Sequence, residues 1–598
     1  MRYFTRRNMP YRLVNISSFT GLIIASWLLA FFTASPAIAE TPPQLFVTIE
    51  GVNGREATNV RNLLGIHAYH RQNAPGASRV RFLHNRAERD IFRALTPYGY
   101  YRIEVDSSLE QRDGDWHAHY RIQPGQPIPI GQVNIEFRGD AANDPQFTQL
   151  RQSLALRSGA RLRHSEYEAS KSRIRNLAAE RGYYQARFVE QELRIDLDRY
   201  QADIHLIFDS GPRYRFGEVR ISEGHLDEDV MRRFIGFESG DLITSNELLM
   251  LQLGMSDSDY FSRVEVQPLW GEADEDFQVP VVVEYEPNQR TFYQTGFGYG
   301  TDTGPRISFE QNRRWVNTRG HRYQGLVQLS EIKTNVGASY IIPGQRPQTD
   351  QYAIRGAWVD ENTSNTRSER LTLGVSWQKQ LTRTQRIVAL DWLDERDRID
   401  GERRNSEFLL PSVQWSRVHA ENRLNVSDGF RLSLTLRGAA ESLLSDTDFS
   451  QAHLAAKTVI RLSDRVRFLT RGDLGISASE DFSKVPTSLR FYAGGDTSIR
   501  GYGYRSIGPR NELGEVLGAR HLLVGSVEFD YEFRPNMRWA VFLDSGNAFN
   551  DITEPMRTGA GIGYRWQSPI GPIRVDLAHG FSYPGDRIRL HLTIGPDL

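Results

Sequence analysis

The stretch Phe491-Tyr-Ala-Gly-Gly-Asp-Thr-Ser-Ile-Arg-Gly-Tyr-Gly-Tyr504 is rich in glycine and aromatic residues and carries a single cation, Arg500. Segments typical of strands flank it on both sides. Gly494, Gly495 and Gly501 allow backbone angles that other residues resist. We therefore expect a loop that folds tightly against another part of the chain, with Arg500 at its tip. The alternative is an ordinary surface turn with a solvated arginine.

The chain around this loop alternates between apolar and polar residues, as a strand with one apolar face does. The alternation begins near residue 290 and is clear in Leu371–Trp377, Phe430–Arg437 and Ile588–Ile594. A membrane barrel turns such an apolar face to lipid, and a segment of this length fits roughly sixteen strands of about ten residues. The sequence therefore predicts an all-β transmembrane barrel of about 16 antiparallel strands over residues 288–598. A series of soluble β-sandwiches is the alternative.

The N-terminus has the three parts of a secretory signal. Arg2, Arg6 and Arg7 make a basic start, an apolar run follows over residues 21–32, and Ala37-Ile-Ala39 supplies small residues at a cleavage site. Such a run is short for a membrane helix. We therefore expect residues 1–39 to be a cleaved signal peptide that directs export, the alternative being an uncleaved anchor.

A weak repeat with a period near 80 residues lies between the signal and the barrel. Each copy contains an aromatic mark that follows a helical segment: Tyr98-Gly-Tyr-Tyr101, Arg181-Gly-Tyr-Tyr184 and Asp259-Tyr-Phe261. The patterning within a copy predicts the order strand, helix, helix, strand, strand. This order resembles the POTRA domain, an α+β module. We place the three POTRA-like units at residues 40–125, 126–211 and 212–287. Such sheets can capture a client strand at an exposed edge, or they can serve only as spacers.

Two carboxylates near the loop are expected to face the barrel lumen. In Leu523–Tyr531, the apolar side chains alternate with Glu528, and in Trp539–Phe549 they alternate with Asp544. A charge inside a barrel is inexpensive only when it is solvated or paired. A loop arginine that reaches inward could pair with both carboxylates, which makes Arg500 the predicted partner of Glu528 and Asp544.

Three short motifs together give the resemblance to a known family. Gly494-Gly495, Ser498-Ile-Arg-Gly-Tyr502 and Phe542-Leu-Asp-Ser-Gly-Asn547 resemble the signature of the BamA/TamA superfamily of POTRA-containing barrel proteins. The resemblance implies that the loop folds into the barrel. Arg500, Gly501 and Tyr502 would form a latch, with Glu528 and Asp544 as its acceptors. Three POTRA-like units match the TamA branch of the superfamily best.

The first and last strands of the barrel suggest a mechanism. Gly296 and Gly298 lie in the first strand, and Gly595 and Pro596 follow the last one. Glycine weakens strand pairing and proline lacks an amide hydrogen. We therefore expect the seam between these strands to be the weakest ladder of the barrel, able to open sideways and to pair with client strands.

The resemblance implies an outer-membrane component of a translocation and assembly module, with periplasmic POTRA domains. It would insert or translocate autotransporter-type and other outer-membrane proteins. The implied partners are a TamB-like protein anchored in the inner membrane, unfolded outer-membrane clients and outer-membrane lipid. The alternative is a pore of the two-partner-secretion type that exports an extended protein client.

Other function classes find no support in the sequence. A net charge of −1 does not suit a nucleic-acid partner, and the absence of cysteine excludes thiolate catalysis and cysteine-based metal sites. The chain has neither a Gly-x-Ser-x-Gly nor a His-Glu-x-x-His motif. We therefore expect no enzyme activity, no catalytic residue, no metal and no cofactor.

Overall fold

The structure is a computed structural model that describes residues 42–363, 366–399, 402–420, 426–569, 571–582 and 588–594. The predicted signal peptide (1–39), Gly595 and Pro596 lie outside the described residues. The chain divides into two compact units, Met1–Arg175 with Arg187–Asp209 and Asn176–Ala186 with Ser210–Leu598.

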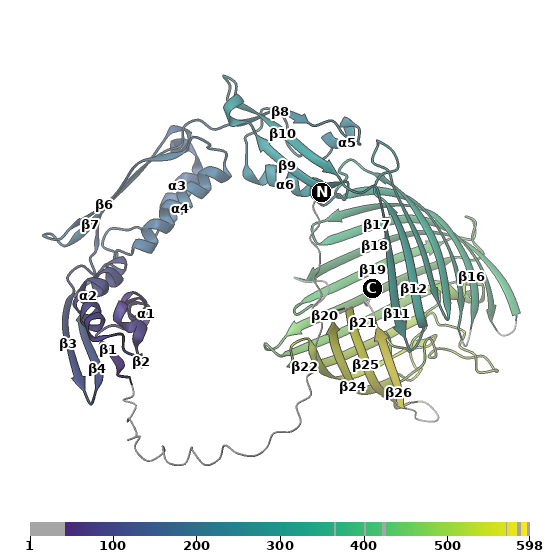
Figure 1. The fold of residues 1–598 in the computed structure, drawn as a ribbon. Coiled ribbons are helices and arrows are strands. Elements are labelled where there is room, and N and C mark those ends of the chain that lie inside the picture. Colours follow the sequence, from purple (N-terminus) through teal and green to yellow (C-terminus); the bar gives the residue numbers. More distant parts are fainter. Residues whose placement is uncertain are drawn as a thin grey trace, which may run out of the picture. The chain divides into compact units, whose positions relative to one another are not determined.

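The first unit contains two small sheets covered by helices (Figure 1). The first sheet has the order β2-β1-β4-β3, and its outer strands pair around the parallel couple β1 and β4. Leu45, Ile91 and Tyr120 are fully buried between the sheet and its helices, so the alternating strand and the helix share one apolar core. The elements are β1 (Gln44–Glu50), α1 (Gly54–Leu63), β2 (Gln72–Asn73), α2 (Ala77–Leu95), β3 (Glu104–Arg112) and β4 (Asp115–Gln123).

The second sheet repeats this topology with the order β5-β7-β6, in which β5 is parallel to β7. Helix α3 begins at Pro145 because Asp144 caps it, with its Oδ1 accepting the Gln146 N–H at 3.0 Å. Strands β3 and β6 lie at sheet edges, with no further strand beside them among the described residues. The elements are β5 (Ile130–Arg138), α3 (Pro145–Ser153), α4 (His164–Glu180), β6 (Arg187–Asp196) and β7 (Gln201–Asp209).

The second unit begins with a third sheet of the same kind, ordered β8-β10-β9 with β8 parallel to β10. Thr244 caps helix α6 by accepting the Glu247 N–H at 3.2 Å. The second and third modules therefore have the predicted order of strand, helix, helix, strand, strand, and the first adds the two-residue strand β2 between its helices. The elements are β8 (Arg215–Ile221), α5 (Glu228–Arg232), α6 (Ser245–Ser256), β9 (Phe261–Pro268) and β10 (Gln278–Pro287).

The rest of the second unit is a closed antiparallel barrel, which within the described residues has 16 strands from β11 to β26 (Figure 1). The fold class predicted from the alternation is thus confirmed. The strands are β11 (Thr291–Gly300), β12 (Gly304–Arg313), β13 (Arg322–Ser330), β14 (Lys333–Pro343), β15 (Asp350–Asn362), β16 (Arg367–Leu381), β17 (Thr384–Ile399), β18 (Glu402–Ala420), β19 (Gly429–Ala439), β20 (Phe449–Arg461), β21 (Val466–Ser479), β22 (His521–Arg534), β23 (Met537–Phe549), β24 (Arg557–Ser568), β25 (Gly571–Gly580) and β26 (Ile588–Ile594).

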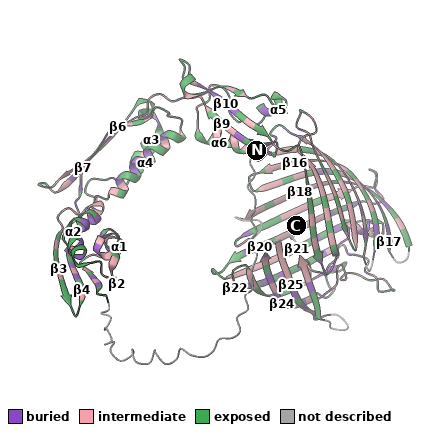
Figure 2. Cartoon of the chain, viewed as in Figure 1, coloured by how far each residue is buried: buried purple, intermediate pink, exposed green. Residues whose placement is uncertain are grey.

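Residues of different burial follow one another along the barrel strands (Figure 2), as the alternation predicts. On β22, Val527 and Phe529 are 40% and 47% exposed and point outward, whereas Glu528 and Asp530 are 8% and 1% exposed and point inward. An apolar outer face and a polar lumen are what a barrel in lipid requires. Among the described residues, no helix is both long enough and apolar enough to cross a membrane.

The aromatic motif that repeats in the three modules makes close packing contacts in each of them. In the first unit, Gly99 has a φ of +84°, and a Cβ there would lie 2.3 Å from the Leu162 carbonyl oxygen of the second module. In the second unit, the ring of Tyr184 stacks on Trp270 at 4.6 Å. Tyr260, in the third mark, donates its hydroxyl to the Gly320 carbonyl in the turn between β12 and β13 at 2.5 Å. Each mark therefore packs against a segment that follows it in the chain.

The third sheet contacts the barrel through that same turn. The Asp227 N–H donates to the Thr318 carbonyl at 2.8 Å, and the ring of His225 lies 4.2 Å from Trp315. Neither ring nitrogen of His225 has a hydrogen-bond partner among the described residues. Burial lowers the pKa of His225 below its usual range. This contact therefore suits a neutral imidazole.

Candidate functional site

Residues 480–520, which join β21 to β22, form the inner loop of the barrel. Ile499, Tyr502 and Ala519 of this loop pack with Val524 of β22 and Ala548 of β23 in one buried apolar cluster. Val524 belongs to the inward face of its strand, because its neighbour Leu523 is exposed on the other face. The stretch with which the sequence analysis began therefore folds into the lumen and packs on the inner wall.

Arg500 is buried against two carboxylates of that wall. Its Nε donates to Asp544 Oδ2 at 2.8 Å, its Nη2 donates to Asp544 Oδ1 at 2.9 Å, and its Nη1 donates to Glu528 Oε2 at 2.7 Å. The guanidinium carbon also lies 3.4 Å from the centroid of the Phe542 ring. The structure thus brings together the three residues whose charges the sequence analysis paired. Charge-assisted bonds of this geometry hold a loop in one position.

The network around Arg500 extends to two residues that the sequence analysis did not single out. Arg565 of β24 forms ion pairs with Glu528 at 3.1 Å and with Asp576 of β25 at 2.6 Å. Arg500 Nη1 lies 3.5 Å from Asp576 Oδ2. Each carboxylate therefore faces at least one guanidinium. This pairing is what makes ionised groups tolerable in a site that is closed to water.

Glycines in the inner loop and in the barrel wall let the two approach each other closely. Gly501 has a φ of +93°, and a Cβ there would lie 2.8 Å from the Gly580 amide nitrogen. On the wall, a Cβ at Gly559 would lie 2.0 Å from the Arg500 carbonyl oxygen. Gly494 and Gly495 also have positive φ angles, of +97° and +112°, but they lie away from the Arg500 network. The predicted loop glycines therefore allow the backbone turn of the inner loop. The missing side chain at Gly559 lets the Arg500 backbone lie directly against β24.

Tyr502 closes the predicted latch motif. Its ring is buried, its hydroxyl donates to the Thr558 carbonyl at 3.1 Å, and it accepts the Ser582 N–H at 3.1 Å. Tyr502 therefore contacts β24 and the segment that follows β25, whereas Arg500 contacts β22, β23 and β25. The motif lies in the lumen against the inner wall, and the role of its residues as a latch stays a prediction.

The seam of the barrel is short. Strands β11 and β26 pair only at Tyr299 with Ile594 and at Gly300 with Thr593 among the described residues, whereas β25 and β26 pair at seven positions. Gly298 lies beside this ladder, since a Cβ there would be 2.9 Å from the Ile594 carbonyl oxygen. Gly296 lies farther along β11, opposite Ser308 of β12.

The inner loop also contacts both strands of the seam. Asp496 accepts a hydrogen bond from the hydroxyl of Thr301, which follows β11, at 3.2 Å. It is also hydrogen-bonded to His591 Nδ1 on β26. The ligand atoms of Asp302, Asp496 and His591 all lie within 4.8 Å of one another. The sequence analysis missed this cluster, because its members meet only when the barrel closes.

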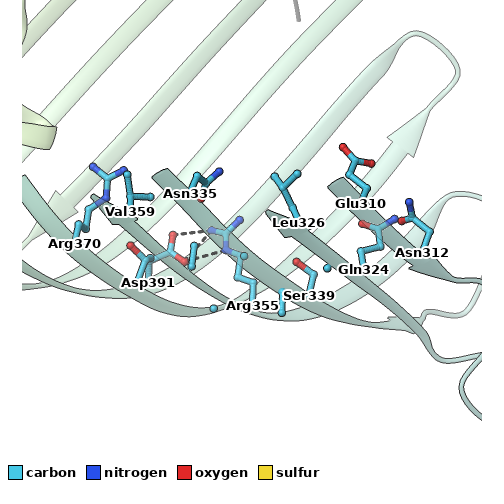
Figure 3. A pocket seen from close by; sticks show the side chains of 16 residues that line it. Glu310, Asn312, Gln324, Leu326, Asn335, Ser339, Arg355, Val359, Arg370 and Asp391 are labelled. Carbon is cyan, nitrogen blue, oxygen red and sulfur yellow. Dashed lines mark hydrogen bonds and ion pairs between the residues drawn. The ribbon is translucent and has the colours of Figure 1, made fainter. Parts of the chain in front are cut away.

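A cavity of about 490 Å³ lies in the lumen along β12 to β17 (Figure 3). Arg355 and Asp391 face each other there, with the Arg355 Nη2 donating to Asp391 Oδ2 at 2.6 Å. Other polar side chains point into the same space, among them Glu310, Asn312, Gln324, Asn335, Ser339 and Arg370. This part of the lumen is polar, and none of its lining residues belongs to the inner loop.

Known proteins resemble the chain in both halves. A family model described as the POTRA domain TamA domain 1 matches residues 47–124. BamA of Nitratidesulfovibrio vulgaris, an outer membrane protein assembly factor, is 24% identical over 61% of this chain and 46% of its own length. BamA of Neorickettsia risticii is 22% identical over 82% of this chain and 68% of its own length. The chain thus spans about half the length of the first of these relatives.

Solved structures show the same fold. The crystal structure of BamA from Haemophilus ducreyi lacking POTRA domains 1–3 superposes with a TM-score of 0.66 and 20% identity, and the match covers 78% of this chain and 99% of that one. The family model described as the Omp85 superfamily domain matches residues 292–597, which is 306 of the 598 residues. Because that match spans the whole barrel with its inner loop and seam, this protein belongs to the Omp85 superfamily.

Proposed function

We propose that this chain is the outer-membrane barrel of a translocation and assembly module that inserts or translocates autotransporter-type and other outer-membrane proteins. Membership of the Omp85 superfamily and two relatives that are outer membrane protein assembly factors support an assembly role in the outer membrane. The match of the first module to a TamA POTRA model supports the TamA branch. The three small modules would then lie in the periplasm.

The short seam is the observation that carries this proposal. Among the described residues, β11 pairs with β26 only at Tyr299 and Gly300, and we infer that the backbone groups of residues 291–298 are available to another strand. A strand edge in lipid leaves amides and carbonyls unpaired, which is costly. A client strand that pairs with β11 would satisfy these groups, so the edge favours strand-by-strand templating.

The exposed edges of the small sheets support a role in binding clients before insertion. Strands β3 and β6 lie at the edges of their sheets, and both are long, with nine and ten residues. An extended segment can add to such an edge through main-chain hydrogen bonds. We propose that these edges receive unfolded clients and a TamB-like protein anchored in the inner membrane. A pull-down of that protein by the whole chain tests the partner, with Ser107→Pro in β3 and Glu192→Pro in β6 as variants that disturb these edge strands.

A disulfide lock tests whether the seam is the route. The chain has no cysteine, so a Tyr299→Cys/Ile594→Cys variant contains one defined pair across the seam. We expect the oxidised form to stop inserting an autotransporter β-domain into vesicles and to recover on reduction. The control pair, Phe309→Cys/Val327→Cys, crosses the neighbouring β12–β13 ladder and should not affect insertion when oxidised. Full insertion by the seam-locked form would contradict the proposal.

The packing of the inner loop favours assembly over export of a client through the lumen. Arg500 and Tyr502 are buried on the wall, so a pore would first have to expel the loop. Single-channel recordings in planar bilayers separate the two functions. We expect small conductance in the wild type and larger conductance after deletion of residues 491–504. A large, stable conductance of the wild type would favour the secretion pore.

A further inference from the structure

We propose that Asp496 is a clasp that holds the seam closed and couples it to the inner loop, so that the seam opens only when the Asp496 carboxylate leaves Thr301 and His591. The importance of such an opening for clients rests on the proposed function. The clasp itself is a property of the closed barrel and can be tested without a client.

The clasp consists of hydrogen bonds that join the two seam strands to each other and to the inner loop. The Leu592 N–H on β26 donates to Thr301 Oγ1 at 3.0 Å, and the Thr301 hydroxyl in turn donates to Asp496. The Thr301 N–H donates back to the Leu592 carbonyl at 3.0 Å. The backbone of Thr301 thus continues the β11–β26 ladder beyond Gly300. Its side chain links this ladder to Asp496 of the inner loop.

The histidine completes the connection on the other strand. The Gly501 N–H donates to His591 Nε2 at 2.9 Å, so that nitrogen is an acceptor and carries no proton. In the neutral ring the proton is then on Nδ1, which donates it to Asp496. The His591 side chain is 2% exposed and that of Asp496 is 13% exposed, so water competes little for these bonds.

The same loop carries the clasp and the Arg500 network. Asp496 precedes Arg500 by four residues, and the amide of Gly501, which bonds to His591, follows Arg500 directly. The loop is therefore fixed on β22 to β25 by Arg500 and on the seam by Asp496. By thermodynamic linkage, any change that frees the loop from Arg500's partners must also favour an open seam, and the reverse holds as well.

A metal ion could in principle be held by Asp302, Asp496 and His591, whose donor set of two carboxylates and an imidazole suits a transition metal. The hydrogen bonds favour a clasp without metal. Both nitrogens of His591 are engaged, and Asp302 Oδ2 accepts the Asp496 N–H at 2.5 Å. A metal would have to displace one of these bonds, and chelation provides the test of this alternative.

Spin labels on the outer face of the seam measure its opening directly. The labels are attached through Phe297→Cys on β11 and Leu590→Cys on β26, two exposed positions outside the clasp. Because the chain has no other cysteine, only these two positions are labelled. In the purified full chain in lipid nanodiscs, we expect Asp496→Ala to raise the population with long label distances by at least about tenfold, because it removes the charge-assisted bonds to both Thr301 and His591. Asp496→Asn, which keeps the shape of the side chain, should give a smaller increase in the same direction.

Matched variants assign this effect to the clasp. Asp551→Ala removes an exposed carboxylate from the β23–β24 loop, whose side chain bonds only within that loop, and should leave the distances unchanged. Asp496→Ala combined with His591→Gln should open the seam by less than the two single effects combined, because both variants remove the bond between Asp496 and His591. Retained resistance of each variant to unfolding in mild detergent shows that the barrel is intact.

Three outcomes would overturn the clasp. These are unchanged distances in Asp496→Ala, full additivity of the Asp496 and His591 variants, and opening of the wild-type seam by EDTA, which would assign closure to a metal ion. A wider seam in Asp496→Ala with unchanged client insertion has a different meaning. It would contradict lateral opening as the client route and leave the clasp standing.

Discussion

Arg500 and Asp544 are joined by three hydrogen bonds: the backbone N–H and Nε of Arg500 both donate to Oδ2 of Asp544, at 3.0 and 2.8 Å, and Nη2 donates to Oδ1 at 2.9 Å. One carboxylate thus fixes both the side chain and the backbone of the loop tip. Asp544 is fully buried and Arg500 is 6% exposed, so neither charge has an alternative partner in water. We therefore predict that this pair holds the inner loop in the lumen.

Arg500→Ala should leave export intact and should lower both barrel stability and assembly activity. The substitution leaves Asp544 buried without its guanidinium, and breaking a buried pair in this way costs about 3–5 kcal/mol. The midpoint of unfolding in urea with lipid vesicles measures the loss. Arg355→Ala is the matched control, because Arg355 also pairs with a lumen aspartate, but its side chain is 37% exposed rather than 7%. An equal loss of stability in both variants would mean that the Arg500 network contributes no more to barrel stability than an exposed ion pair in the lumen.

Gly559→Ala should displace the inner loop without removing any charge. The added Cβ would lie 2.0 Å from the Arg500 carbonyl oxygen, which is closer than any real contact. We expect the loop to become accessible to protease, and stability to fall by an amount similar to the Arg500→Ala effect. The double variant should be little worse than either single one, because both unseat the same loop. Gly472→Ala on β21 is the control, since a Cβ there meets no atom within 4 Å.

Some members of the Arg500 network could be predicted from the sequence, because the pattern of neighbouring residues fixes which way their side chains point. Alternation around Val527 places Glu528 on the inward face, and the glycine-rich stretch marks Arg500 as the tip of a tight loop. Asp576 has the same kind of alternating neighbours on β25, but nothing in its own strand connects it to Arg500. Gly559 has no local signal either, because its role depends on the path that the loop takes.

The seam shows the other limit of prediction from sequence. Gly296 and Gly298 indicate a weak first strand, and the structure places Gly298 beside the short ladder. The contacts of Asp496 could not be foreseen, because Thr301 and His591 are 195 and 95 residues away from it in the chain. Such contacts follow from closure of the barrel, which no periodicity specifies.

His225→Phe should remove a pH dependence from the contact between the third sheet and the barrel. Burial lowers the pKa of His225, so the unfolded chain, with an ordinary pKa of about 6.5, binds the proton first as pH falls. The stabilisation is therefore complete above about pH 6.5 and is lost as pH falls toward the lowered pKa.

Hydrogen exchange of the Asp227 amide, which donates to Thr318, reports on this contact. We expect exchange, corrected for its intrinsic pH dependence, to increase below pH 6.5 in the wild type and to stay constant in His225→Phe. Phenylalanine can keep the packing on Trp315, Phe261 and Tyr285. His119→Phe in the first sheet is the control and should behave as the wild type does. A wild-type contact that is insensitive to pH would contradict the prediction.

Asp302→Asn should make the seam less sensitive to pH. Burial and the neighbouring Asp496 raise the pKa of Asp302, in the turn after β11, to about 6. A raised carboxyl pKa means that the folded state binds the proton more tightly than the unfolded state, so its stabilisation is complete below about pH 4 and is lost as pH rises through about 6. Among the described residues, three other ionisable groups face Asp302: His591 and Arg589 on β26, and Tyr504 of the inner loop.

We expect the long-distance population of labels at Phe297→Cys and Leu590→Cys to increase between pH 5 and pH 8 as the two carboxylates come to repel each other. In Asp302→Asn the side-chain oxygen can still accept the Asp496 N–H, but this position no longer ionises, so the increase should be smaller. An identical pH profile in the variant and the wild type would show that repulsion between Asp302 and Asp496 does not act on the seam.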